Sequence, residues 1–118
     1  MIERLLYIVD AESYSDKQWD FVKKFAKLIN TRLFAIRFVN KLKGKEEDRA
    51  WEVLYSIEDD AFGEEIKISL FVEKKSEGKL RSIINAYDIN MVVMHRNSGY
   101  IKTLKGINIP VLLLPKEV

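Results

Sequence analysis

The sequence contains no cysteine and only one histidine, His95, among its 118 residues. Disulfides and thiolate metal sites are therefore excluded, and one imidazole is too few for the usual zinc sites. No apolar run approaches the roughly 18 residues of a membrane span, and the apolar segment near the N-terminus lacks the basic flank of a signal peptide. We therefore expect a cytoplasmic protein with no metal ion and no membrane contact.

An excess of charge of one sign is also missing. The chain has 20 basic and 18 acidic side chains, a net charge of +2 that does not indicate nucleic-acid binding. Its hydrophobic content of 47% is that of a globular protein with a full core. A length of 118 residues suits one ordinary domain, so we expect a single domain over residues 1–118.

Short apolar runs alternate with amphipathic segments along the whole chain. The run at 5–9 is typical of a strand covered on both faces, and further apolar runs, at 33–39 (broken only by Arg37), 91–94 and 111–114, also predict strands. Residues 66–73 alternate apolar and polar side chains instead, as an edge strand does. Segments with helical spacing separate the strands, and the last one, near Tyr100–Leu104, is short. This order predicts a doubly wound parallel α/β sheet with Rossmann-like layers.

Local signals mark where the helices begin and end. Ser15 followed by Gln18 forms the pattern of a capping box at a helix start. Asn30 suits the left-handed residue that ends the same helix. Apolar residues over 50–61 predict a second helix, which we expect to end at Gly63.

Several stretches, taken in order, resemble the universal stress protein family. The stretch IVDAESYS keeps Asp10 and Ser15 at the separation of the family's VDGSxxS, and RFVN resembles its HVV ending, which places Val39. GKLRSIINAYDINMVVMHRNSG resembles the family's third helix and fourth strand, and IPVLLLP resembles its terminal strand. The similarity covers nearly the whole chain, except that residues 44–62 match only in helical character.

The resemblance implies a flavodoxin-like sheet of five parallel strands in the order 3-2-1-4-5, with a short fourth helix. The alternating third strand and the apolar fifth strand would then be the two edges. Family members dimerise through the last strand, and an uncovered apolar edge favours pairing. We therefore expect a homodimer whose edge consists of Val111, Leu112, Leu113 and Leu114.

That strand order places a ligand crevice between the first and fourth strands, where the order of the sheet reverses. The candidate nucleotide- or anion-binding residues are Asp10, Val39, His95, Arg96, Asn97, Ser98 and Gly99. In nucleotide-binding relatives the backbone matching Val39 flanks an adenine, and Asp10 would bond to the base or ribose. An alternative is that Asp10 only ends the strand and orients the following turn.

The residues after the fourth strand carry the expected anion chemistry. Asn97 or Ser98 would cap the short helix, whose free amides would face the crevice, while Gly99 would permit close backbone approach. Arg96 would add a forked contact to phosphate, or would be a solvated surface residue. His95 has no evident nucleophile or carboxylate partner nearby in the sequence, so we expect no general base.

The chain departs from the family pattern after the fourth strand. ATP-binding members have a glycine at the strand end and a later Gly-Ser or Gly-Thr that wraps the phosphates. Here His95 stands at the strand end, Gly106 precedes Ile107, and the segment from Gly99 to Pro110 is short. We expect the imidazole to obstruct a pyrophosphate and the shortened loop to lack phosphate-binding amides. The nucleotide-binding motif therefore looks degenerate.

Two functions follow as hypotheses. The first is a non-enzymatic, dimeric universal-stress-type protein without tight ATP binding, which acts in a stress response through contacts with a protein partner of unknown identity. The alternative is a small-ligand binder with a reduced site for AMP, ATP or phosphate at the crevice. The residues that motivate it are Asp10, Val39, Arg96, Ser98 and Gly99. An enzyme is the third possibility, but no nucleophile–base pair or carboxylate dyad is evident, so we expect none.

Overall fold

The computed structural model describes residues 2–76 and 78–118 of the chain. Five parallel strands form one sheet in the order β3-β2-β1-β4-β5, which confirms the predicted fold class and strand order. The elements along the chain are β1 (Arg4–Ile8), α1 (Asp16–Ile29), β2 (Arg32–Val39), α2 (Lys45–Gly63), β3 (Ile68–Lys74), α3 (Lys79–Ala86), β4 (Met91–His95), the 3-10 turn η1 (Lys102–Leu104) and β5 (Val111–Leu114).

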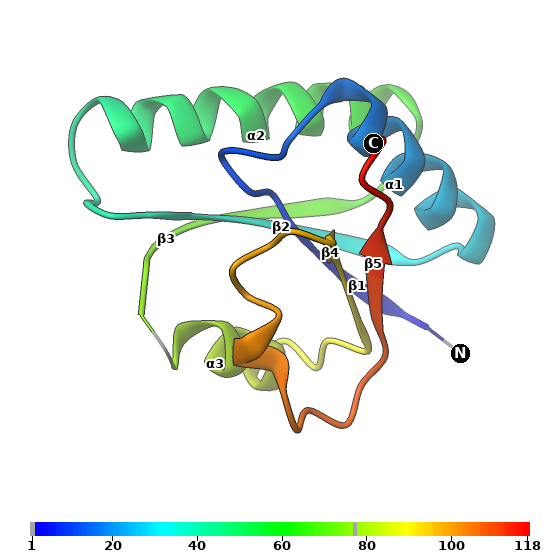
Figure 1. Ribbon diagram of the computed structural model, residues 1–118. Helices are drawn as coiled ribbons and strands as arrows, with labels where there is room; N and C mark the ends of the chain where they lie inside the picture. The colour runs from blue at the N-terminus through cyan, green and yellow to red at the C-terminus, as the bar shows by residue number, and fades with distance from the viewer. Residues whose placement is uncertain (1, 77) are drawn as a thin grey trace.

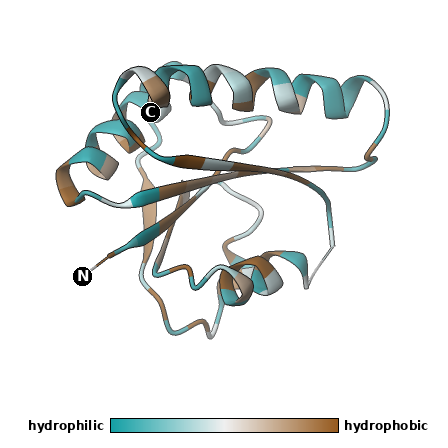
Figure 2. Cartoon of the chain, turned by 180° about the vertical axis from the view of Figure 1, so that it is seen from behind, coloured by the Kyte–Doolittle hydropathy of each residue, from teal (hydrophilic) through white to brown (hydrophobic). Residues whose placement is uncertain are grey.

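Helices cover both faces of the sheet, as Figure 1 shows, with α1 and α2 on one side and α3 with η1 on the other. Strand residues alternate between the two cores. Leu5, Tyr7 and Val9 pack under α1 and α2, whereas Leu6 and Ile8 pack under α3. Hydrophobic residues therefore gather in the strands between the layers, and the outer surfaces of the helices are mostly polar (Figure 2).

The start of α1 satisfies only half of the predicted capping box. The Ser15 hydroxyl accepts from the Gln18 amide at 3.1 Å, as predicted. The Gln18 side chain turns into the protein instead, where its Oε1 accepts from the Tyr7 hydroxyl at 2.6 Å. Gln18 is fully buried, so its amide group is used to satisfy the buried tyrosine rather than the helix end. Asn30 ends α1 in the left-handed conformation, with φ 51°, as predicted.

Helix α2 is longer than its apolar pattern indicated. It begins at Lys45, after Gly44, whose φ of 92° and missing side chain leave the helix without a side-chain cap. Acidic residues in the first turn, Glu46, Glu47 and Asp48, suit the positive end of the helix dipole. The helix ends at Gly63, as predicted.

The two edge strands differ in the way the sequence indicates. β3 pairs only with β2, and its residues are half-buried up to the exposed Lys74. β5 pairs only with β4, with Val111 opposite Val92 and Leu114 opposite His95. In β5, Leu114 is fully buried, whereas Val111 and Leu113 are exposed at 38% and 44%. Only part of the predicted dimer edge therefore presents side chains to the surface.

Candidate functional site

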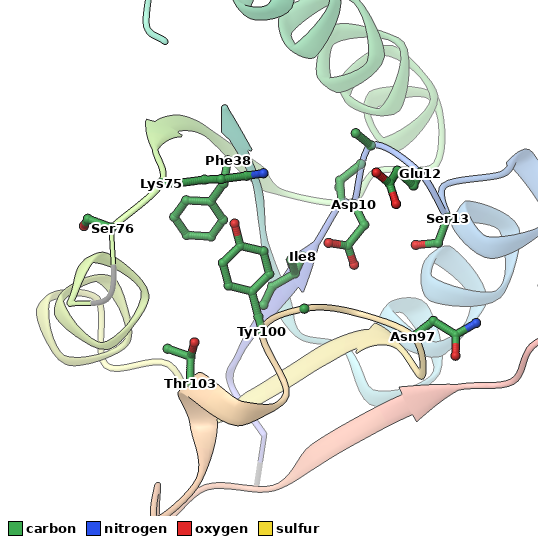
Figure 3. A pocket seen from close by; sticks show the side chains of 13 residues that line it. Ile8, Asp10, Glu12, Ser13, Phe38, Lys75, Ser76, Asn97, Tyr100 and Thr103 are labelled. Carbon is green, nitrogen blue, oxygen red and sulfur yellow. The ribbon is translucent and has the colours of Figure 1, made fainter. Parts of the chain in front are cut away.

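A cavity of about 700 Å³ lies at the carboxyl ends of the strands, where the order of the sheet reverses between β1 and β4. Its walls come from the end of β1 and the loop after it, from Phe38 in β2, and from the segments that follow β3 and β4. Open parallel sheets bind ligands at this kind of position, because both flanking loops turn away from it to opposite faces. Figure 3 shows these side chains around the cavity.

The structure brings three of the predicted site residues to the cavity wall, namely Asp10, Asn97 and Gly99. Four others do not line it. Val39 and His95 are buried, with exposures of 0% and 4%. Val39 lies on the same face of β2 as Leu33 and Ala35, and His95 on the same face of β4 as Met91 and Val93; these four neighbours pack in the core under α1 and α2. The neighbouring Phe38 points into the cavity instead.

The imidazole of His95, predicted to obstruct a pyrophosphate, is buried and does not itself line the cavity. Its Nδ1 accepts a hydrogen bond from the Asn97 amide at 3.1 Å, so the ring supports the turn from beneath. Arg96 is exposed and does not line the cavity either. Ser98 is buried, and its hydroxyl accepts from the Tyr100 amide at 3.2 Å.

The predicted capped helix after β4 is also absent from the described segment. Only the three-residue turn η1 forms there, and no side chain caps it. The amides of the preceding turn bond within the protein instead. Arg96 N donates to Leu114 O at 3.1 Å and Ser98 N donates to His95 O at 2.9 Å. Together with the bonds to the Asn97 and Tyr100 amides, these leave few donors for a phosphate.

A buried network holds the loop after β1 in place. The Tyr7 hydroxyl donates to Gln18 Oε1 at 2.6 Å, and Gln18 Nε2 donates to the Ser13 carbonyl at 3.2 Å. The Tyr14 amide donates to the Asp10 carbonyl at 3.1 Å. The first strand, the loop and α1 are therefore linked, and the loop presents Asp10 and Ser13 to the cavity in a fixed arrangement.

Asp10 is the most unusual polar residue of the cavity wall. Its Oδ2 is buried and has no hydrogen-bond partner among the described residues. Burial raises the pKa of the Asp10 carboxyl, while the nearby Ser98 hydroxyl, His95 and Arg37 partly oppose that rise. Within the same part of the chain, the Ser13 hydroxyl is likewise buried without a partner.

Several cavity residues were not predicted from the sequence. Tyr100 stacks on Phe38, with ring centroids 4.7 Å apart and planes at 27°. Burial, with a smaller contribution from Asp10, raises the pKa of Tyr100 to about 12, so its hydroxyl stays protonated at neutral pH. Lys75 and Ser76 enter from the loop after β3. The signal that could have found them is topological, because the carboxyl ends of neighbouring parallel strands open to the same edge.

Metal and membrane chemistry find no support in residues 2–76 and 78–118. No group of three or more His, Cys, Asp or Glu side chains there is arranged to hold a metal ion. No helix in those ranges is long and apolar enough to cross a membrane.

Solved structures resemble this fold over nearly its whole length. A protein of the universal stress protein family from Burkholderia pseudomallei superposes with a TM-score of 0.78 at 14% identity, covering 97% of this chain and 96% of the other. A universal stress protein from Archaeoglobus fulgidus gives 0.74 at 14% identity, with coverage of 96% and 93%. The chain has the fold of the universal stress proteins.

That fold also includes a universal stress protein from Arabidopsis thaliana solved with AMP bound, with a TM-score of 0.70 at 10% identity and coverage of 96% and 91%. No protein-family model matches the chain, and no curated protein is significantly similar to it. The likeness to universal stress proteins is thus one of three-dimensional structure.

Proposed function

We propose that this chain belongs to the universal stress protein family and binds a small organic ligand, without catalysis, in the cavity between β1 and β4. The observation that carries the proposal is the cavity of about 700 Å³ at the reversal of strand order. Its size falls within the range of roughly 300–1,000 Å³ typical of small-molecule sites. Its wall combines an aromatic pair with a small number of polar groups, which is the usual composition of such sites.

The AMP bound to the Arabidopsis relative supports a ligand of nucleoside or nucleotide type. Tight ATP binding is not part of the proposal, because most amides of residues 96–101 already bond within the protein. A catalytic role is not part of it either. The Ser13 hydroxyl has no base within hydrogen-bonding distance in the described chain, and the buried His95 does not line the cavity.

Gly99 offers a direct test of the cavity. A Cβ added there meets nothing within 4 Å, and Gly99 lines the cavity, so we expect a leucine at this position to occupy part of the cavity. We expect adenosine or AMP to raise the melting temperature of the wild-type protein and to have no effect on Gly99→Leu. Gly63→Leu is the matched control, because a Cβ at Gly63 is equally unobstructed but lies far from the cavity.

Binding by isothermal titration calorimetry would measure the same effect directly. If neither adenosine, AMP nor ATP binds the wild-type protein, the proposal is wrong. It is also wrong if Gly99→Leu binds as tightly as the wild type, because the ligand would then sit elsewhere.

A second candidate function is a homodimer formed through β5, which would present a surface to a protein partner in a stress response. The exposure of Val111 and Leu113, at 38% and 44%, on an edge strand is the observation that favours it. Apolar edge strands pair readily unless they are covered. The two candidates are compatible, since β5 lies at the edge of the sheet and contributes no residue to the cavity wall.

A further inference from the structure

The acidic side chains of this protein are concentrated in one helix. Residues 45–65, which comprise α2 and the turn after it, contain nine acidic and two basic side chains, so half of the chain's 18 acidic side chains lie there. The rest of the chain is correspondingly basic, because the net charge of the whole is +2. A surface with many carboxylates attracts cationic partners and repels nucleic acids and anionic membranes.

A line of exposed side chains runs along the outer face of α2. Its members recur at alternating spacings of four and three residues, and we call them the acidic stripe: Asp48, Glu52, Tyr55, Asp59 and Phe62. This spacing places side chains in line along one face of a helix. The opposite face of α2 packs on the sheet through the buried residues Ala50, Leu54, Ile57 and Ala61. Carboxylates and aromatic rings of the stripe are therefore presented to solvent together.

The two aromatic residues of the acidic stripe have the character of interface anchors. Phe62 is 84% exposed and Tyr55 is 52% exposed. The Tyr55 ring is also held in place, because it stacks on Trp51 with ring centroids 5.3 Å apart. The Trp51 indole N–H in turn donates to Glu47 Oε2 at 3.2 Å. Large, ordered aromatic side chains are common anchors of protein interfaces, because they bury much apolar area for little loss of conformational entropy.

The carboxylates of the acidic stripe are not used by the fold. None of the ion pairs within residues 2–76 and 78–118 includes Asp48, Glu52 or Asp59. The acidic residues of this region that face α1 differ, since Asp60 pairs with Lys23 at 2.8 Å and Glu64 pairs with Lys27 at 2.6 Å. The acidic residues toward α1 therefore link the two helices, whereas those of the stripe remain available to a partner.

The acidic stripe ends at a hollow of about 870 Å³. Asp59 and Phe62 belong to both the stripe and the wall of the hollow. The charged side chains of this wall are three carboxylates and two cations, namely Glu58, Asp59, Glu65, Arg32 and Lys67. Ile66 and Ile68 add apolar surface. Carboxylates beside apolar surface suit the charged head and apolar stem of a lysine or arginine side chain.

We propose that the acidic stripe of α2 binds a lysine- or arginine-rich amphipathic helix of another protein. The alternating spacing of the stripe matches a second helix packed along α2. Apolar side chains of the partner contact Tyr55 and Phe62, and its basic side chains pair with Asp48, Glu52 and Asp59. The charge of the stripe selects this partner over other apolar helices.

The proposed surface is separate from the cavity and from the β5 edge. Helix α2 packs on β2 and β3 (Figure 1), whereas β5 lies at the opposite edge of the sheet. No residue of the acidic stripe lines the cavity between β1 and β4. Contact between the α2 helices of two copies is unfavourable, because it brings carboxylates together. A dimer through β5 would leave the stripe open to its partner.

Fluorescence anisotropy with labelled synthetic peptides tests the proposal on the full chain. The probe is a leucine–lysine peptide of about 18 residues whose leucines recur at the alternating spacing of an amphipathic helix. One control peptide has the same composition in scrambled order, and another has glutamate in place of lysine. We expect the patterned lysine peptide to bind about tenfold more tightly than the scrambled one, and to bind more weakly as salt is added. The glutamate peptide should not bind.

Substitutions on the stripe identify the surface. Phe62→Ala and Glu52→Lys should each weaken binding of the patterned lysine peptide about tenfold, because one removes an aromatic anchor and the other reverses a charge. The matched controls are Tyr87→Ala, an aromatic residue 43% exposed at the end of α3, and Glu117→Lys, an exposed acidic residue after β5. Both controls should bind the peptide as the wild type does. The melting temperature of each stripe variant should stay close to that of the wild type, since both side chains are exposed.

Several results would overturn the proposal. The stripe is not a helix-binding surface if the patterned lysine peptide fails to bind, if the scrambled peptide binds equally well, or if Phe62→Ala and Glu52→Lys leave binding unchanged. Self-association that Phe62→Ala abolishes in light scattering would show that a second copy covers the stripe instead. Binding to vesicles of anionic lipid that Phe62→Ala abolishes would identify a membrane contact instead. Adenosine binding tests the cavity separately, because Phe62→Ala should leave it unchanged.

Discussion

At the scale of single residues, Asp10 shows opposed requirements for folding and binding. Its carboxyl is partly buried, and Oδ2 has no donor among the described residues. Burial raises the pKa of this carboxyl, so the ionised form is less favourable in the folded protein than in the unfolded chain. Stability therefore falls as the pH rises from the ordinary aspartate pKa, about 3.9, through the raised value in the folded state.

Asp10→Asn should therefore stabilise the protein at neutral pH, by about 1 kcal/mol, while it weakens ligand binding. The gain should vanish below about pH 3, where the carboxyl is protonated in both the folded and the unfolded state. Urea denaturation of both proteins at the two pH values measures this difference. A loss of stability at neutral pH would show that Asp10 is a structural residue instead, and Asp59→Asn controls for net charge.

At the scale of elements, alternation along a strand decides which predicted side chains reach the site. Val39 and His95 occupy the right ends of β2 and β4, but the pleat directs them toward the core under α1 and α2. The neighbour of Val39, Phe38, faces the cavity. The motif positions therefore predicted the correct end of each strand, but they did not show which residue at that end points into the cavity.

The exposed edge of β5 allows a direct test of the proposed dimer. Leu113 is 44% exposed on a strand that pairs only with β4. If the dimer forms there, Leu113→Lys places a charge in an apolar strand contact and should leave a monomer. The melting temperature of that monomer in dilute solution should stay close to that of the wild type, since the side chain is already exposed.

Light scattering at matched concentration distinguishes the two species. Leu28→Lys is the control, because Leu28 is 83% exposed on α1, away from β5. A wild-type protein that is monomeric, or a Leu113→Lys variant that remains dimeric, would rule out this interface.

At the scale of the whole molecule, stability should be highest in the middle of the sheet. β1 lies between β2 and β4, and residues 5–8 have exposures of 0–1%. The segment 99–110 contains only η1 and exposed turns. Native-state hydrogen exchange should therefore show β1 amides exchanging more than about 100-fold slower than those of residues 99–110.

The same experiment reports on the ligand. Adenosine should slow exchange in the loop after β1 and in residues 99–103, which line the cavity. If the amides of β1 and of residues 99–110 exchange equally slowly without ligand, the middle of the sheet is not the most stable part of the molecule, and the prediction is wrong. NMR or mass spectrometry can follow these amides.

The order of the elements was determined by the sequence alone. Short continuous apolar runs favour strands, and short connections between them allow few topologies. Residues 66–73 alternate apolar and polar side chains, which predicted an edge strand, and β3 lies at the edge of the sheet beside β2. The Ser15 cap and the left-handed Asn30 are local backbone effects, so they were also predictable.

Only the tertiary structure decided which side chains line the crevice and which hydrogen bonds they make. The sequence could not show that His95 turns under the loop and occupies the Asn97 amide, because that depends on the pleat of β4. It could not show that Gln18 serves Tyr7 rather than its own helix, since this requires α1 to pack on β1. Asp10, Tyr100 and Lys75 belong to loops far apart in the chain, and only the assembled sheet brings them to one cavity.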